Sequence, residues 1–188
     1  KNKLEYKYLP IESVAIYVPG STASYPSSVL MNAVPAIVAG VKRIVMVNPG
    51  LNGKQNPAVL YAARKCKIKE IYSLGGPSAI AAMAYGTESV PKVNKIFGPG
   101  NSFVTMAKQL VAQTIPGMAI DMPAGPSEVL VIADERANPE FIAADLLSQA
   151  EHGADSQVIL LCNSENIIEQ TQQALTRQLA NLSRKETA

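Results

Sequence analysis

The stretch Val14-Ala15-Ile16-Tyr17-Val18-Pro19-Gly20 decides the fold of this chain of 188 residues. Its first five residues are apolar, and most of them are β-branched or aromatic, which predicts a strand buried on both faces and ended by the Pro-Gly pair. Residues 27–39 then carry apolar side chains at helical spacing, and residues 43–47 form a second run that is apolar after its first residue, Arg43. This order is typical of a β-α-β unit, in which a helix connects two parallel strands.

The same alternation continues to the end of the chain. Short apolar runs bounded by Gly, Pro, Asn or Ser predict strands, and most of the segments between them have the apolar spacing of helices. The predicted strands are residues 14–18, 43–47, 70–73, 95–97, 118–121, 129–133 and 157–161, and the predicted helices are residues 27–39, 57–65, 77–84, 102–113, 139–151 and 165–182. Pro57, Pro77 and Pro139 fall in the first turns of three of these helices, where a missing N–H costs no hydrogen bond.

We therefore predict an α/β fold with a doubly wound, mostly parallel sheet. The sheet resembles an incomplete Rossmann fold, and part of a second α/β domain follows it. Seven strands are more than one mononucleotide-binding half contains. Residues 123–127 include two prolines and a glycine, which indicates a connection between two sub-sheets. The predicted domains are a Rossmann-like unit over residues 1–127 and part of an adjoining α/β domain over residues 128–188.

Composition excludes several classes of protein. Hydrophobic residues make up 47% and charged residues 17%, as in ordinary globular proteins. The 17 basic and 15 acidic residues form no dense basic block, so no nucleic acid partner is expected. Cys66 and Cys162 form no paired motif and are predicted to be reduced core residues. The lack of a long apolar stretch or an apolar signal core predicts a soluble, cytoplasmic protein without a membrane partner.

Stretches that contain glycine follow four of the predicted strands. They are Pro19-Gly20-Ser21-Thr22, Gly75-Gly76, Gly98-Pro99-Gly100-Asn101 and Pro123-Ala124-Gly125-Pro126-Ser127. Ligands of open parallel sheets bind beyond the carboxyl ends of the strands, so four such loops predict one crevice for a polar ligand. Each loop by itself has a simpler interpretation, because glycine most often serves tight turns and an asparagine such as Asn101 is a common helix N-cap. None of them has the G-x-G-x-x-G pattern.

The sole histidine, His152, follows the helix predicted over residues 139–151. Gln149 lies three residues earlier and so projects from the same helix face, and Gly153 is typical of the residue that ends a helix. Glu151 projects in another direction and is not expected to act with His152. Two interpretations stay open: a histidine that complements the helix dipole, or two ligands of one metal. Since two ligands make half of a four-ligand site, any metal site would be completed by other residues.

From about residue 14 to residue 161 the sequence resembles the histidinol dehydrogenases. The blocks that carry the resemblance are Tyr17-Val18-Pro19-Gly20, Tyr85-Gly86-Thr87-Glu88-Ser89-Val90-Pro91-Lys92-Val93, Lys95-Ile96-Phe97-Gly98-Pro99-Gly100-Asn101, Asp121-Met122-Pro123-Ala124-Gly125-Pro126-Ser127-Glu128-Val129 and Leu146-Leu147-Ser148-Gln149-Ala150-Glu151-His152-Gly153. The resemblance implies oxidation of L-histidinol to L-histidine through a bound aldehyde, by two hydride transfers to NAD, with zinc holding the substrate. It also implies a place in histidine biosynthesis and a homodimer.

The resemblance also assigns site residues by position. Three residues match contacts with NAD: Tyr17, Ser78 and Asn101. Ser127 matches a contact with the substrate. Gln149 and His152 match two zinc ligands that also approach the substrate. Two positions depart from the family pattern, because Ser78 stands where a glutamine is usual and Ser21 where a second glycine is usual. Ser78 is shorter than glutamine and therefore reaches less far toward the cofactor.

Part of the family's site has no counterpart in this sequence. The resemblance implies that the remaining zinc ligands, an aspartate and a histidine, and a glutamate–histidine acid/base pair belong to a region with no match before Ala188, so no catalytic residue is assigned. We expect the chain to be the central portion of such an enzyme and to lack activity by itself. The alternative is a stand-alone, non-catalytic nucleotide-binding or assembly module. A phospho-acceptor domain is disfavoured because no acidic cluster follows the first predicted strand.

Overall fold

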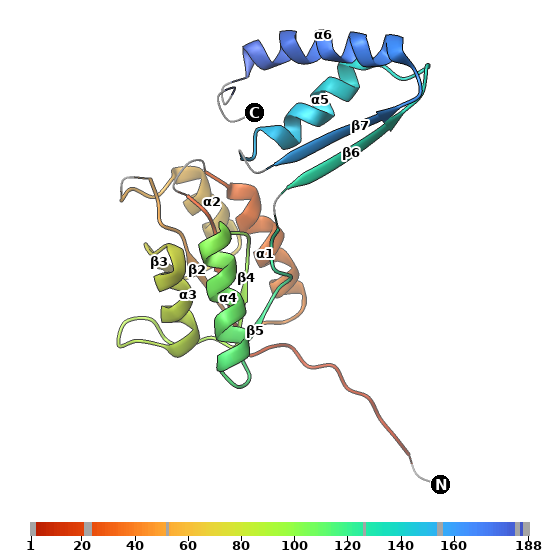
Figure 1. The fold of residues 1–188 in the computed structure, drawn as a ribbon. Helices are drawn as coiled ribbons and strands as arrows, with labels where there is room; N and C mark the ends of the chain where they lie inside the picture. The colour runs from red at the N-terminus through yellow and green to blue at the C-terminus, as the bar shows by residue number, and fades with distance from the viewer. Residues whose placement is uncertain are drawn as a thin grey trace. The chain divides into compact units, whose positions relative to one another are not determined.

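The structure is a computed structural model that describes residues 3–20, 24–51, 53–125, 127–153, 156–182 and 185. The chain divides into two compact units, Lys1–Ala124 and Gly125–Ala188, and each is described by itself (Figure 1). The sequence predicts the boundary after residue 127, and the division falls within the same connecting stretch. In the described part of the chain, no helix combines the length and the apolar character that crossing a membrane requires.

The first unit contains a five-stranded parallel sheet. Its strands are β1 (Ser13–Tyr17), β2 (Arg43–Val47), β3 (Glu70–Tyr72), β4 (Lys95–Phe97) and β5 (Ala119–Ile120). Their order is β3-β2-β1-β4-β5, and every pairing is parallel. This is the Rossmann strand order 3-2-1-4-5-6 without the sixth strand, and it confirms the predicted, incomplete Rossmann-like fold class. The strand order reverses between β1 and β4.

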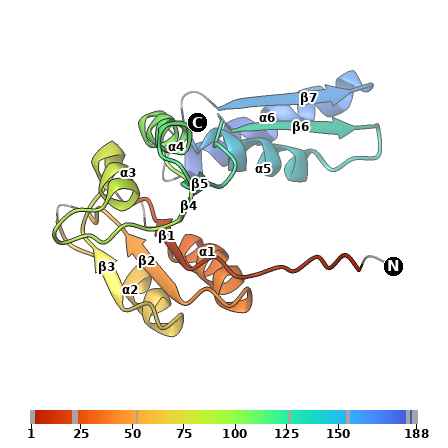
Figure 2. The same cartoon turned by 90° about the horizontal axis from the view of Figure 1, so that it is seen from below.

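Four helices cover the two faces of this sheet (Figure 2). On one face lie α1 (Pro26–Val38) and α2 (Pro57–Lys65), and on the other lie α3 (Gly76–Tyr85) and α4 (Ser102–Thr114). Alternate residues of β1 point to opposite faces, so Ile16 packs in the layer of α1 and α2, whereas Ala15 and Tyr17 pack in the layer of α3 and α4. Burial on both sides is the reason that these strands are continuous apolar runs in the sequence.

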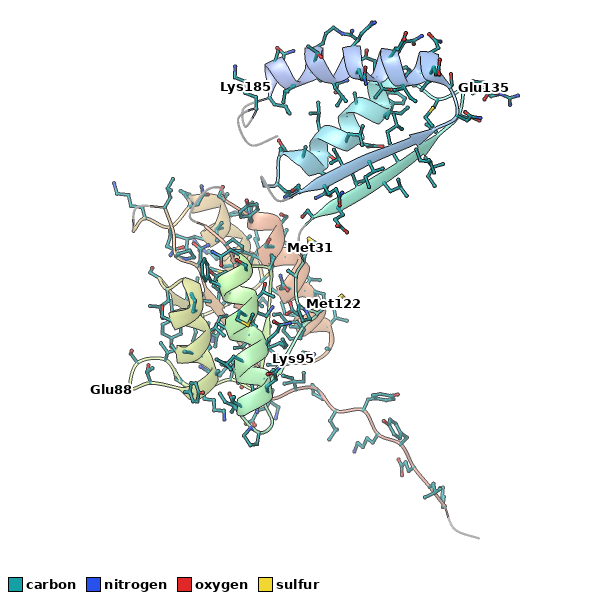
Figure 3. All side chains as sticks on the ribbon, in the orientation of Figure 1. Met31, Glu88, Lys95, Met122, Glu135 and Lys185 are labelled. Atoms are coloured by element: carbon teal, nitrogen blue, oxygen red, sulfur yellow. The ribbon has the colours of Figure 1, made fainter. Side chains whose placement is uncertain are left out.

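The second unit is a two-stranded parallel sheet with two helices. Its elements are β6 (Glu128–Ala133), α5 (Pro139–Ala150), β7 (Gln157–Cys162) and α6 (Glu165–Asn181). Both helices pack on one face of the sheet, around Ile142, Leu146 and Ile167. Side chains project from the other face (Figure 3), where Ile132 is 73% exposed. The apolar runs of β6 and β7, like that of β1, indicate strands buried on both faces, and this expectation is wrong for β6 and β7 in this chain because α5 and α6 lie on the same side.

The predicted helix starts and cysteine states can be compared directly with the structure. Pro57, Pro77 and Pro139 lie in the first turns of α2, α3 and α5, which confirms the prediction. Both cysteines are free: Cys66 is buried in the core between the sheet and α1 and α2, and burial raises the pKa of its thiol. Cys162 is only partly buried, because it is the last residue of β7, and it packs against the smaller core of the second unit.

Candidate functional site

Loops gather around the carboxyl end of β1, where the strand order reverses. Tyr17, the last residue of β1, is 5% exposed. Its hydroxyl accepts a hydrogen bond from the amide of Gly76, the first residue of α3, at an O···N distance of 3.1 Å. The amino end of α3 therefore lies beside the end of β1, although β1 and β3 are separated by β2 in the sheet. The end of β1 and the loop after β3 thus lie side by side, and the crevice for a polar ligand stays a prediction.

The loop after β4, residues 98–101, is called the glycine loop here, and it lies against the backbone of β1. Gly98 has a φ of +110°, and a Cβ atom at this position would come 2.1 Å from the carbonyl oxygen of Tyr17. A Cβ atom on Gly100 would come 2.3 Å from the side chain of Val104 in α4. Both positions thus require glycine for close packing. The same packing places a backbone without side chains at the reversal of strand order, where ligands of this fold bind.

Asn101 has the N-cap role that the sequence left open. It precedes α4, and its Oδ1 accepts a hydrogen bond from the amide of Val104 at 3.0 Å. The residue is exposed, and the positive end of the dipole of α4 begins here. A contact between Asn101 and a cofactor stays a prediction.

Ser78 lies in the first turn of α3 and is exposed. Its hydroxyl donates a hydrogen bond to the carbonyl of Gly75 at 3.1 Å, within its own turn. The amino ends of α3 and α4 thus both open at the carboxyl edge of the sheet, an arrangement that favours an anionic group. The part of Ser78 in binding such a group stays a prediction.

Asn48 organises the loops after β1 and β2, a role that the sequence patterns do not predict. It directly follows β2 and is 1% exposed. Its Nδ2 donates hydrogen bonds to the carbonyls of Val18 at 2.7 Å and Pro19 at 3.1 Å, and its Oδ1 accepts one from the amide of Gly50 at 3.1 Å. The available signal was an Asn-Pro-Gly sequence directly after a buried strand. Beside it opens a pocket of about 160 Å³, lined by Gly20, Ser24, Asn48, Gly50, Leu51, Asn56 and Val59.

A partly buried ion pair contacts the glycine loop, and the sequence patterns do not predict it. Lys108 of α4 is 3% exposed, and its Nζ donates a hydrogen bond to the carbonyl of Gly98 at 2.8 Å and pairs with the carboxylate of Asp121. The Oδ2 of Asp121 accepts a hydrogen bond from the amide of Gly98 at 2.7 Å. The only signal in the sequence is a lysine at a position of α4 where Val104 and Val111 mark the buried face.

The remaining predicted site residues lie in the second unit, at the amino ends of its strands. Ser127 precedes β6, and its carbonyl accepts a hydrogen bond from the amide of Gln157, the first residue of β7, at 3.0 Å. Gln149 is half-buried in the last turn of α5. His152 is exposed in the turn after α5, and its amide donates to the carbonyl of Gln149 at 3.2 Å. The chain in this unit therefore brings all three residues to one end of the sheet.

These residues by themselves do not form a metal centre. Among the residues that the structure describes, no three side chains of the types His, Cys, Asp or Glu gather closely enough to hold an ion. An exposed imidazole with an amide one turn earlier fits zinc as half of a four-ligand site. The position of His152 after the last turn of α5 fits the helix-dipole role equally, so both interpretations stay open.

The fourth glycine-containing stretch differs from its prediction. Residues 123–127 do not lead into a helix but connect β5 of the first unit to β6 of the second. The stretch thus connects two sheets, as its prolines and glycine indicate, and the expectation that it forms a fourth loop leading from a strand into a helix is wrong. Ser21, Thr22 and Pro126 lie outside the described residues.

Comparison with known proteins identifies the family. The chain matches the family model of histidinol dehydrogenase over residues 1–188. It is 77% identical over 185 residues to the histidinol dehydrogenase of Pseudoalteromonas translucida (strain TAC 125), covering 98% of this chain and 43% of the relative. It is 56% identical over 179 residues to the histidinol dehydrogenase of Escherichia coli (strain K12), covering 95% of this chain and 41% of the relative.

Solved structures agree with this result. The crystal structure of histidinol dehydrogenase from Elizabethkingia anophelis superimposes with a TM-score of 0.88 at 57% identity, covering 95% of this chain and 41% of that one. A putative aldehyde dehydrogenase from Anabaena variabilis, with a TM-score of 0.56 at 15% identity, shares the fold alone. The chain spans about two fifths of the length of the curated relatives it matches. Because the family model matches this chain along its whole length, the chain belongs to the histidinol dehydrogenase family.

Proposed function

We propose that this chain is the central portion of a histidinol dehydrogenase, which oxidises L-histidinol to L-histidine through the aldehyde with two NAD in histidine biosynthesis. The observation that carries the proposal is the position of Tyr17 and the glycine loop at the reversal of strand order, in a chain of this family. That position is where Rossmann-like sheets bind dinucleotides. NAD, when bound, accepts the hydride that leaves the substrate carbon.

The residues of the first unit fit a dinucleotide. Its phosphates require amide donors and a close approach to the backbone, which the amino ends of α3 and α4 and the two glycines of the glycine loop offer. We assign contacts with NAD to Tyr17, Ser78 and Asn101. The hydrogen bond to Gly76 orients Tyr17, and the N-cap bond to Val104 orients Asn101 at the start of α4.

The residues of the second unit fit a substrate and half of a zinc site. Zinc, when bound, holds the substrate and withdraws electron density from the atoms it contacts. Gln149 and His152 would hold the ion together with ligands from outside this chain, and Ser127 would contact the substrate. The acid/base residues also lie outside this chain in the proposal. The chain therefore contributes binding and orientation, and we propose that it has no activity by itself.

We further propose that the whole protein acts as a cytoplasmic homodimer. The exposed apolar face of β6 and β7, with Leu130 at 55%, Ile132 at 73% and Leu161 at 59% exposure, supports the burial of this surface by further protein. Light scattering on the purified whole protein tests the dimer. A monomer at micromolar concentration would contradict it.

A chimera tests the proposed activity. In the Escherichia coli enzyme, the stretch of 179 aligned residues is replaced by the corresponding residues of this chain. We expect the chimera to reduce NAD with L-histidinol, to retain zinc after dialysis, and to support growth without histidine in a strain that lacks its own enzyme. A chimera that melts like the parent enzyme and yet oxidises no L-histidinol would contradict the proposal.

A further inference from the structure

We propose that Lys108 and Asp121 are positioning residues, which hold the glycine loop in the conformation that binds the dinucleotide. The inference rests on the proposed function, because it takes NAD as the ligand of this loop. Neither residue is among those that the family resemblance assigns to the site. The geometry around Gly98 carries the inference.

Gly98 is the point at which β4 leaves the sheet. The pairing of β1 with β4 ends at Ile16 and Phe97, one residue before Gly98. Gly98 is buried, so its amide and its carbonyl both need partners within the protein. Asp121 accepts from the amide at 2.7 Å, and Lys108 donates to the carbonyl at 2.8 Å. The ion pair thus replaces the strand partner for both backbone groups of this residue.

The ion pair also connects three elements at the carboxyl edge. Lys108 comes from α4, and Asp121 comes directly after β5. The backbone amide of Asp121 donates to the carbonyl of Ile96 in β4 at 3.2 Å, so this residue is held on both its backbone and its side chain. The glycine loop is therefore held at its first residue by the ion pair and at its last residue, Asn101, by the N-cap bond. Two glycines would otherwise leave this loop conformationally free.

Packing alone does not favour a lysine at position 108. Lys108 is the one buried charged residue among those the structure describes, and Val104 and Val111 share its buried face of α4. A buried pair can often be replaced by apolar residues without loss of stability. An apolar side chain, however, gives no donor to the carbonyl of Gly98. The lysine therefore adds a fixed loop conformation that an apolar residue would not provide.

Asp121 has a second consequence for the chain. It is the first residue of the connection that leads to Ser127, and the next residue, Met122, is 87% exposed (Figure 3). The carboxylate that holds the glycine loop thus also fixes the start of this connection. Loss of the ion pair is therefore expected to loosen the glycine loop and the first residues after β5, whereas Ser127 keeps its own hydrogen bond to Gln157.

The test uses the whole enzyme that carries this segment, with the variants Lys108→Met and Asp121→Asn. Lys108→Met keeps the side-chain length and removes the donor, and Asp121→Asn keeps the shape and removes the charge. Glu70→Gln is the matched control, because it breaks the pair of Arg43 and Glu70, 2.7 Å apart, at the amino ends of β2 and β3, the opposite edge of the same sheet. For each variant, calorimetry gives the Kd for NAD, and steady-state kinetics gives kcat and the KM values for NAD and L-histidinol. Amide hydrogen exchange reports on the glycine loop.

We expect Lys108→Met and Asp121→Asn each to raise the Kd and the KM for NAD at least tenfold, while the KM for L-histidinol and kcat at saturating NAD change less than threefold. Peptides that cover the glycine loop should exchange at least tenfold faster. In the double variant, the loss of NAD affinity should be smaller than the product of the two single losses, because the two residues act as a unit. Glu70→Gln should leave the Kd for NAD unchanged.

Several results would overturn the inference. If both single variants bind NAD within twofold of wild type, or exchange in the glycine loop is unchanged, the pair does not position the loop. If Glu70→Gln weakens NAD binding as much, general loss of stability accounts for the effect. Should Lys108→Met fail to fold, the isosteric Asp121→Asn alone decides by the same measures. A wild-type enzyme that neither binds NAD nor oxidises L-histidinol would instead overturn the proposed function, and this inference with it.

Discussion

The hydroxyl of the buried Tyr17 accepts a hydrogen bond from the amide of Gly76 at 3.1 Å, and so joins the end of β1 to the first turn of α3. Tyr17 and α3 are packed in the same core layer. The first amides of a helix have no partner within the helix, and here a phenol from a neighbouring strand supplies one. The side chain expected to contact NAD is thereby oriented before any ligand binds.

Tyr17→Phe in the whole enzyme removes this acceptor and leaves the ring in place. We expect a loss of about 1 kcal/mol in the free energy of unfolding, the usual net value of one hydrogen bond. We also expect weaker NAD binding, because the end of α3 loses its connection to β1. Urea unfolding and calorimetry measure the two effects. Tyr85→Phe is the control, since Tyr85 ends the same helix and is 63% exposed. Equal effects of the two substitutions would contradict the prediction.

Gln149 and His152 are tested by zinc content. In the whole enzyme, His152→Ala should lose zinc on dialysis and should lose L-histidinol oxidation, whereas NAD binding should survive. Gln149→Ala should retain more zinc, because an amide oxygen is a weaker ligand than an imidazole for this ion. The exposed Gln172 of α6 provides the control substitution to Ala. Wild-type zinc content in His152→Ala would return this histidine to the helix-dipole role.

Ser78→Gln restores the residue that the family resemblance leads us to expect at this position. Ser78 is exposed in the first turn of α3, so a longer side chain disturbs no core packing. One additional hydrogen bond to NAD would lower the Kd by about fivefold, on the order of 1 kcal/mol. Calorimetry on the whole enzyme measures this, with the exposed Ser148→Gln as the control. An unchanged Kd in Ser78→Gln would mean that this turn does not contact the cofactor.

The pair of Arg43 and Glu70 predicts a dependence of stability on pH. The hydrogen bond from Arg43 holds the pKa of Glu70 below its ordinary value. A group whose pKa is lowered by folding stabilises the protein above its unfolded pKa, and the contribution disappears as pH falls through the folded value. Since both side chains are about a third exposed, solvent screening keeps the contribution below about 1 kcal/mol.

Glu70→Gln should therefore lower the melting temperature at neutral pH and should approach wild type below about pH 4, the ordinary glutamate range. Glu88→Gln, in an exposed loop of the same unit, is the control substitution. Melting curves of the whole enzyme across the acid range give the comparison. A constant difference between Glu70→Gln and wild type over that range would show that Glu70 does not contribute through its charge.

Local patterns were enough to predict the elements of this chain. Each predicted strand and helix ends within one residue of the observed one, as with residues 57–65 against α2 and residues 139–151 against α5. Apolar runs between turn residues mark buried strands, and prolines mark first turns, because both effects act over a few neighbouring residues. The placement of Tyr17, Ser78 and the glycine loop at the carboxyl edge of the sheet also follows from the sequence, because each stands at or after the end of a strand of one parallel sheet.

Exposure and long-range contacts were not encoded in these patterns. Leu130 and Ile132 have the same apolar pattern as the residues of β1, yet one face of β6 is exposed because α5 and α6 both pack on the other. In the same way, Asn48 looks like an ordinary turn residue until its amide is seen to hold the loop after β1.

The sequence by itself determined the order of strands and helices along the chain, the parallel α/β class and the family, because these depend on periodicity, turn residues and uninterrupted motifs. Only the tertiary structure decided that Lys108 and Asp121 meet at Gly98. Lys108 lies on α4, Asp121 follows β5 and Gly98 follows β4. From the local sequence, the first two look like surface charges and the third looks like a turn glycine. Their contact depends on how α4 packs across the sheet, and side-chain packing between separate elements leaves no period in the sequence.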